Sequence, residues 1–148
     1  MQSVLYLYRK QETMRPELND KISEIMTVQP MTVQVHEPLQ KVYELMNKLC
    51  IRHIPVEEDT VLKGMISKSD LDKWQYLYST NSNLSTPLTA KEVMTKSLHT
   101  IQHDDTIKDA AEMLSLASFH ALPVMQDEKL AGIVTSTDLI IYLLKDHK

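Results

Sequence analysis

The sequence predicts a mixed α/β (α+β) fold built from two tandem copies of one repeat. The chain has two glycines, Gly64 and Gly132, which lie 68 positions apart. At the same offset, residues 24–71 align without a gap with residues 92–139 and share 13 identical residues in 48 positions, where chance would give roughly three. Most of the other pairs are conservative exchanges. The pattern therefore indicates an internal duplication.

Both copies show the same expected order of elements, strand–helix–strand–strand–helix. The first strand is expected at 31–35 in one copy and at 98–101 in the other, because these stretches are rich in β-branched residues. A helix follows, since apolar residues recur at i, i+3, i+4 and i+7 from Leu39 and from Ile107.

Two strands separated by a polar turn come next, and a second helix closes each copy. The helix is expected to start at Asp70 in the first copy and at Asp138 in the second, with apolar residues on one face. The strands are expected at 54–56 and 61–66 in the first copy and at 122–124 and 130–134 in the second.

These elements divide the chain into an N-terminal arm (1–19), a first repeat (20–78), a linker (79–89) and a second repeat (90–148). The linker is assigned because it is polar and rich in turn-forming residues. A unit of about 55 residues buries little core by itself. The two repeats are therefore expected to pack on each other through their sheets, related by a pseudo-twofold axis.

Composition and charge exclude several classes of function. The net charge is −4, and acidic and basic residues are interspersed without a basic run, which argues against nucleic acid as a partner. The apolar stretch 4–8 is far too short to cross a bilayer. Cys50 is the single cysteine, so no intrachain disulfide can form. The chain is expected to be cytoplasmic, with no membrane partner.

The residues with the clearest chemistry close each repeat, at 64–70 and 132–138. Both segments read glycine–apolar–apolar–hydroxyl–x–hydroxyl–aspartate. The pattern predicts a buried strand that runs into a helix, where free N–H groups favour a phosphate and a carboxylate can accept hydrogen bonds from ribose hydroxyls. The alternative is a capping box, in which hydroxyl and carboxylate only satisfy the helix terminus. Retention of the pattern in both diverged copies favours nucleotide binding.

The order of these motifs resembles a pair of CBS (cystathionine-beta-synthase) domains, also called a Bateman module. The resemblance rests on Ile25-Met26-Thr27, Thr32-Val33, Ile54-Pro55-Val56 and the segment 64–70, and it covers residues 20–145. It implies a disc-like assembly with two clefts between the repeats. In such clefts the aspartate binds ribose, the preceding hydroxyls hold ribose and phosphates, and apolar residues cover the adenine.

Transferred to this sequence, the resemblance implies two sets of ligand-binding residues. One cleft would use Asp138, Thr135, Thr137, Leu122 and Pro123, closed by Thr27, Pro30 and Thr32. The other would use Asp70, Ser67, Ser69, Ile54 and Pro55, closed by Thr95, Leu98 and Thr100. His120 and Arg52 stand where related proteins place a basic residue that contacts phosphate.

The two clefts are expected to differ in preference. The Asp138 cleft is expected to be the better nucleoside site, because Thr27, Pro30 and Thr32 match the adenine segment of the family. The Asp70 cleft is expected to accept more phosphate, because Arg52, His53 and Lys68 are expected beside it.

The function implied is that of a regulatory sensor for adenosine-containing ligands of the AMP, ADP and ATP class. Two alternatives stay open: a structural dimerisation module without nucleotide, and a sensor of S-adenosylmethionine or NADH. No catalytic set of residues, metal site or cofactor is expected, and the protein is not expected to be an enzyme. A homodimer is expected through Trp74, Tyr78, Tyr142 and Leu143 of the second helices, and the effector is expected to be a separate protein.

Overall fold

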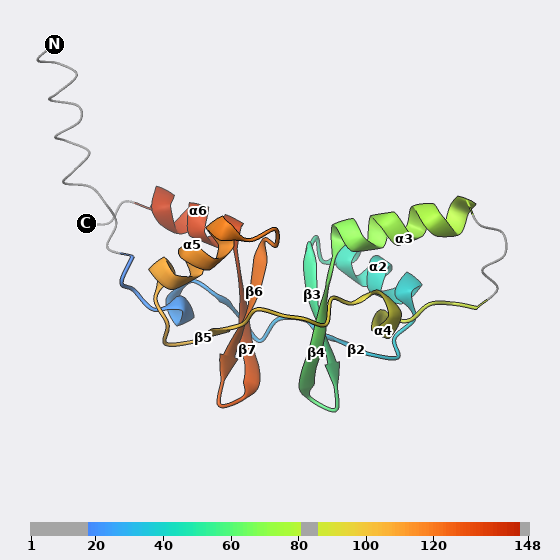
Figure 1. Ribbon diagram of the computed structural model, residues 1–148, viewed down its shortest axis with the longest axis horizontal. Helices are drawn as coiled ribbons and strands as arrows, with labels where there is room; N and C mark the ends of the chain where they lie inside the picture. The colour runs from blue at the N-terminus through green and yellow to red at the C-terminus, as the bar shows by residue number, and fades with distance from the viewer. Residues whose placement is uncertain (1–17, 81–85, 146–148) are drawn as a thin grey trace, which may run out of the picture.

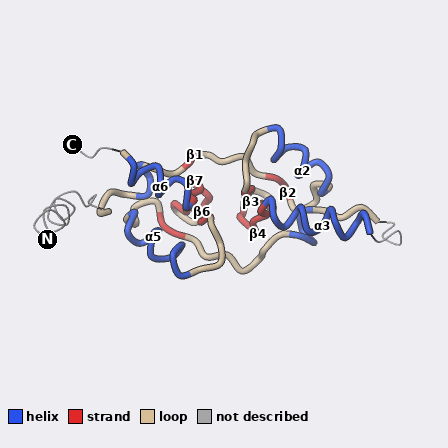
Figure 2. The backbone as a smooth tube through the Cα atoms, turned by 90° about the horizontal axis from the view of Figure 1, so that it is seen from above, coloured by secondary structure: helices blue, strands red, loops and turns tan. Residues whose placement is uncertain are grey.

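The computed structural model describes residues 18–80 and 86–145, which form two α/β halves placed side by side (Figure 1). The two sheets face each other at the centre of the molecule and the helices lie outward (Figure 2). Most of the predicted N-terminal arm and the middle of the predicted linker lie outside the described residues.

The predicted order of elements is confirmed in both repeats. The first half of the sequence forms η1 (Ile22–Glu24), β1 (Thr27–Val28), β2 (Val33–Gln34), α2 (Leu39–Lys48), β3 (His53–Glu58), β4 (Val61–Ser67) and α3 (Lys68–Thr80). The second half forms α4 (Ala90–Val93), β5 (Ile101–Gln102), α5 (Ile107–Leu116), β6 (Ala121–Gln126), β7 (Lys129–Thr135) and α6 (Ser136–Leu144).

The boundaries of the last helix in each repeat differ from the prediction. Helices α3 and α6 begin at Lys68 and Ser136, two residues before the motif aspartates, because the hydroxyl residue before each helix caps it. Helix α3 continues to Thr80, so the first two residues predicted for the linker are helical.

Strand pairing repeats at the offset found in the sequence. β3 pairs antiparallel with β4, with His53 opposite Ser67, and β6 pairs antiparallel with β7, with Ala121 opposite Thr135. β2 runs parallel to β3, and β5 runs parallel to β6. The register of each hairpin also shifts at equivalent positions, after Val56 and after Val124. The halves therefore share one topology.

The first residues of each repeat are built into the opposite repeat. β1 pairs with β7, with Thr27 opposite Ile133, and Thr95 makes the equivalent bridge to Met65. Ile22 lies in the core of the second half, and its equivalent Ala90 lies in the core of the first. The units of packing therefore differ from the units of sequence repetition.

A third apolar cluster joins the two halves. Met65, Ala121 and Ile133 are buried together, with Leu98 packed against them. Met65, Ala121 and Ile133 lie on the sheet faces that point away from the helices, since side chains alternate between the two faces of a strand. The sheets of the two repeats therefore contact each other, as predicted. None of the helices in the described ranges is long and apolar enough to cross a membrane.

The two glycines allow the exchanged segments to pass close to β4 and β7. A Cβ atom on Gly132 would lie 2.5 Å from Met26 Sδ and 2.8 Å from the Thr27 carbonyl oxygen, and one on Gly64 would lie 2.6 Å from Met94 Sδ. We expect Gly132→Ala to lower the free energy of unfolding by about 1–3 kcal/mol. Gly64→Ala should lower it by a similar amount, because a Cβ there would also lie 2.9 Å from Met94 Cβ, which a change of rotamer cannot move. Urea melts measure both variants, and an unchanged free energy of unfolding in either would contradict this account.

Candidate functional site

Two clefts lie between the halves, and each contains one motif aspartate. The Asp138 cleft has a volume of about 610 Å³ and the Asp70 cleft a volume of about 900 Å³. Met65 and Ala121 of the central cluster line the Asp70 cleft, and Ile133 lines the Asp138 cleft. Both volumes fall in the range of small-molecule sites.

Each motif aspartate caps the helix that carries it. Oδ2 of Asp138 accepts hydrogen bonds from the Thr135 N–H at 2.8 Å and from the Thr135 hydroxyl at 2.7 Å. Asp70 makes the same pair of contacts with Ser67, at 3.2 and 2.6 Å. The capping box is therefore present at both sites, as the alternative reading of the motif proposed.

Capping occupies only one oxygen of each carboxylate. Within the described part of the chain, Oδ1 of Asp138 has no hydrogen-bond or ion-pair partner, while Oδ1 of Asp70 lies 4.0 Å from the Lys73 ammonium. A carboxylate has about four acceptor positions. Capping and ribose binding are therefore compatible, and the two interpretations of the motif do not exclude each other.

A third capping box has the same local geometry as the two motifs but lies outside the clefts. The location inside a cleft therefore distinguishes the motifs from an ordinary capping box. Oδ2 of Asp109 accepts from the Thr106 N–H at 2.9 Å and from the Thr106 hydroxyl at 2.6 Å at the start of α5. Thr106 and Asp109 line neither cleft. This box therefore serves as an internal reference for a cap without a ligand site.

Basic side chains gather in the Asp138 cleft. Arg52, Lys68, His53 and His120 line it together with Asp138. The Arg52 carbonyl oxygen accepts from the Lys68 N–H at 2.8 Å, and the His120 carbonyl oxygen accepts from the Ser136 N–H at 3.0 Å. These bonds fix the residue before β3 and the residue before β6 to the first turn of the following helix.

His53 lies between the two clefts and lines both. Burial lowers its pKa below the usual value of 6.5, and the charges of His120 and Arg52 act in the same direction, whereas Asp70 opposes them. Folding therefore favours the neutral form of this imidazole.

The lowered pKa of His53 predicts that the protein loses stability in mild acid. Between about pH 7 and about pH 5, the unfolded chain takes up a proton at this residue and the folded chain resists it, so the free energy of unfolding falls. His53→Gln should reduce this fall, whereas the exposed His36, replaced in the same way, serves as the control. Urea melts at both pH values measure the effect, and an unchanged pH dependence in His53→Gln would contradict it.

The family model for the CBS domain matches the chain twice, at residues 22–76 and 90–145. The chain belongs to the CBS domain family. Among its relatives, the CBS domain-containing protein YhcV of Bacillus subtilis strain 168 is 28% identical over 120 residues, which are 81% of this chain and 83% of that protein. The crystal structure of CBSX2 in complex with AMP superposes with a TM-score of 0.70 at 26% identity, covering 84% of this chain and 96% of that one.

The CBS pair also resembles a region of larger proteins. Homoserine O-acetyltransferase of Methanohalobium evestigatum is 31% identical over 120 residues, which are 80% of this chain and 23% of the enzyme. The chain thus spans about a quarter of that relative, and the match does not show an enzymatic domain. Family and relatives support a regulatory, ligand-binding module.

The structure of this CBS pair brings many of the predicted site residues together. Thr27, Pro30, His120, Thr135, Thr137 and Asp138 line the Asp138 cleft. Ser67, Ser69, Asp70, Thr95 and Leu98 line the Asp70 cleft. In both clefts, the motif comes from one repeat and the closing segment from the start of the other repeat, which is the arrangement predicted.

Several predicted residues lie elsewhere. The side chains of Ile54 and Leu122 are fully buried in the two cores, because they point toward the helices while the next residue on each strand points to the opposite face. Pro123 accordingly lines the Asp70 cleft and not the Asp138 cleft. Pro55 is fully buried and lines neither cleft.

The two predicted closing threonines also lie outside the clefts. The Thr32 hydroxyl donates to Glu57 Oε2 at 3.0 Å, beside a groove along α2. Thr100 is exposed and lines neither cleft.

The predicted distribution of basic residues is reversed in the structure. Arg52 and Lys68 belong to the repeat that carries Asp70, yet both line the Asp138 cleft, and His53 and His120 line both clefts. The sheets meet at the centre of the molecule (Figure 2), so the start of β3 faces the motif of the other repeat.

The main feature missed by the sequence is the apolar wall of the Asp70 cleft. Met113, Leu116 and Phe119, at the end of α5 and just after it, line this cleft. The ring of His99 stacks on Phe119 with centroids 5.1 Å apart. The sequence does not predict this wall, because apolar residues at helical spacing are equally expected in a hydrophobic core. In the described part of the chain, no group of three or more histidine, cysteine, aspartate or glutamate residues is placed to hold a metal ion.

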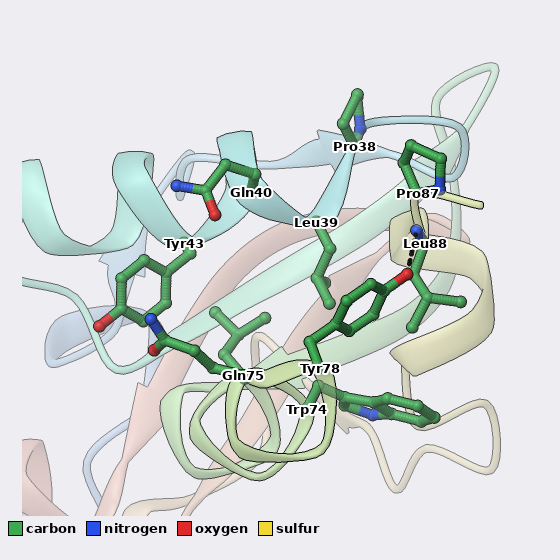
Figure 3. A pocket seen from close by; sticks show the side chains of 10 residues that line it. Pro38, Leu39, Gln40, Tyr43, Trp74, Gln75, Tyr78, Pro87 and Leu88 are labelled. Carbon is green, nitrogen blue, oxygen red and sulfur yellow. Dashed lines mark hydrogen bonds between the residues drawn. The ribbon is translucent and has the colours of Figure 1, made fainter. Parts of the chain in front are cut away.

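A smaller pocket of about 230 Å³ lies in the first half between α2, α3 and the segment before α4 (Figure 3). Tyr43, Trp74 and Tyr78 line it with aliphatic residues. The Tyr78 hydroxyl donates to the Thr86 carbonyl oxygen at 2.7 Å and accepts from the Leu88 N–H at 3.1 Å. Tyr78 therefore fixes a neighbouring segment, and it was predicted instead as a dimer contact.

Tyr142, which aligns with Trp74, is also not available as the predicted dimer contact. It is 6% exposed in the core of the second half. Its hydroxyl donates to Asp20 Oδ2 at 2.6 Å.

Proposed function

We propose that this CBS pair is a regulatory sensor that binds adenosine-containing ligands in its two clefts. The observation that carries the proposal is the position of the two motif aspartates. Each aspartate lies at a helix start that is rich in hydroxyl groups, inside a cleft that residues of both repeats line. The two aspartates occupy equivalent positions in the two repeats. The similarity to CBSX2, whose structure contains AMP, supports an adenosine ligand.

Binding in these clefts would act on the packing of the two repeats. The Asp138 cleft combines Thr27 and Pro30 from the exchanged N-terminal segment with Thr135 and Asp138 from the second repeat and Arg52 from the first. A ligand that contacts all three parts favours the arrangement in which they are close. We propose that a separate effector protein in the cytoplasm responds to this change.

The test is a thermal-shift screen with AMP, ADP, ATP, S-adenosylmethionine and NADH. A ligand at about 100 times its dissociation constant stabilises the folded state by about 2.7 kcal/mol. We expect at least one adenosine compound to raise the melting temperature. If none of the five compounds does so, the alternative of a dimerisation module without nucleotide is favoured.

We also propose a homodimer formed through α3 and α6. Ile140, Ile141, Leu143 and Leu144 of α6 are 56%, 50%, 50% and 79% exposed, and Tyr76 of α3 is 68% exposed. Both helices lie on the same side of the molecule (Figure 1), so one partner could cover both apolar surfaces. A second copy of the chain is the partner that offers the same surface in return.

For the dimer, we expect light scattering at tens of micromolar to give twice the monomer mass. Ile141→Lys should shift the protein to monomer, because it places a charge in an apolar interface. Val61→Lys is the control, since Val61 is 54% exposed on the β3–β4 hairpin. A wild-type monomer with and without nucleotide would overturn the proposal.

A further inference from the structure

We infer that the two clefts select ligands by different 5′ groups. The Asp138 cleft takes an adenosine compound with a phosphorylated 5′ end, and the Asp70 cleft takes one whose 5′ substituent is uncharged and apolar. The inference rests on the proposed function, because it assumes that adenosine is the part common to both ligands.

The charges of the Asp138 cleft carry the first half of the inference. Arg52 and Lys68 reach this cleft from the opposite repeat. Arg52 is exposed and makes no ion pair among the described residues. A free guanidinium can bind phosphate oxygens through two parallel hydrogen bonds. The Lys68 ammonium donates a hydrogen bond to Asn47 Oδ1 and lies 5.6 Å from the Tyr43 ring centroid. Of the lysine and arginine side chains that the structure describes in this cleft, Arg52 is therefore the one that is free to bind a phosphate.

The Asp70 cleft offers no comparable cation. Among the described residues that line this cleft, Lys73 is the single lysine or arginine, and its ammonium lies 4.0 Å from Asp70 Oδ1. This positive charge is directed at the carboxylate that would hold ribose. A phosphate in the Asp70 cleft would therefore find no lysine or arginine free to pair with it, and it would lie near the carboxylate of Asp70.

The apolar wall of the Asp70 cleft gives the second half of the inference. Met113, Leu116 and Phe119 line it, and Leu116 is 90% exposed. An apolar group bound there would remove this surface from water, which is favourable, whereas a hydrated phosphate would gain nothing from it. The cleft is also the larger of the two, at about 900 Å³ against about 610 Å³.

The difference between the clefts originates in the divergence of the repeats. The residues 68 positions after Arg52 and Lys68 are His120 and Ser136. The first repeat thus provides two full cations at positions where the second repeat provides an imidazole and a hydroxyl. Because these positions face the opposite repeat, the first repeat determines the charge of the Asp138 cleft.

The experiment compares AMP with 5′-methylthioadenosine, an uncharged thioether of adenosine, by calorimetric titration of the full chain. Arg52→Gln should weaken AMP binding by roughly 10-fold or more and leave methylthioadenosine binding unchanged. Leu116→Asp should weaken methylthioadenosine binding and leave AMP binding unchanged. Lys129→Gln removes an exposed cation outside both clefts and is the matched control for Arg52→Gln.

The outcomes separate the inference from the proposed function. If the wild-type protein binds adenosine compounds and either variant affects both ligands equally or neither, the assignment of 5′ groups is wrong and the sensor function stands. If the wild-type protein binds neither probe, the proposed function fails, and the selectivity fails with it. If Arg52→Gln weakens only AMP binding and Leu116→Asp weakens only methylthioadenosine binding, the sensor function and the assignment of 5′ groups are both supported.

Discussion

Asp138→Asn is expected to weaken AMP binding by roughly 10- to 150-fold while the protein remains folded. The asparagine side chain keeps one oxygen, which can still accept from the N–H and hydroxyl of Thr135 as Oδ2 of Asp138 does, at 2.8 and 2.7 Å. Its amide nitrogen replaces Oδ1 and cannot accept a hydrogen bond from a ribose hydroxyl. The substitution therefore separates binding from capping, which an alanine at the same position would remove together.

The control for this variant is Asp109→Asn. Asp109 makes the same capping contacts with Thr106, at 2.9 and 2.6 Å, outside both clefts. Any loss of stability caused by an asparagine cap should appear in both variants, and a loss of AMP affinity only in Asp138→Asn. Urea melts beside calorimetric titrations measure both quantities. If both variants bind AMP as the wild type does, Asp138 is a capping residue alone.

Local patterns in the sequence were sufficient to predict the elements of the fold. Helical periodicity from Leu39 and Ile107 gave α2 and α5, and the repeated offset between Gly64 and Gly132 gave two copies of one topology. Both signals depend on residues close in sequence or on direct comparison of the copies. Both signals can therefore be interpreted without knowing how the two halves pack.

The composition of each cleft depends on packing between the halves and was only partly predictable. The motif aspartates were placed correctly in two clefts, but Arg52 faces the aspartate of the other repeat. That placement follows from the face-to-face packing of the two sheets, and a short sequence motif does not predict such packing. The misplacement of Ile54 and Leu122 was avoidable, because a residue adjacent to a cleft-facing position on a strand points to the opposite face.

The exchange of N-terminal segments leads to a strong prediction for the stability of the second half. Ile22 lies at the start of the first repeat but is fully buried in the core of the second, near Ile107 and Leu122. Backbone hydrogen bonds of 2.9 Å fix this segment, from the Ile22 N–H to the Asp105 carbonyl and from the Ile107 N–H to the Asp20 carbonyl. Removing the side chain would leave a cavity that these bonds prevent from closing.

We therefore expect Ile22→Ala to lower the free energy of unfolding by about 2–5 kcal/mol. The equivalent position in the first half is already alanine, Ala90, which is also fully buried, so alanine is compatible with the backbone at this place in the repeat. The expected loss thus reflects packing against the second core and not helix or turn preference. Val28→Ala, in the same segment at a side chain that is 61% exposed, should change stability by about 0.5 kcal/mol or less. Equal losses for the two variants in urea melts would show that residues 18–28 are not part of the second core in solution.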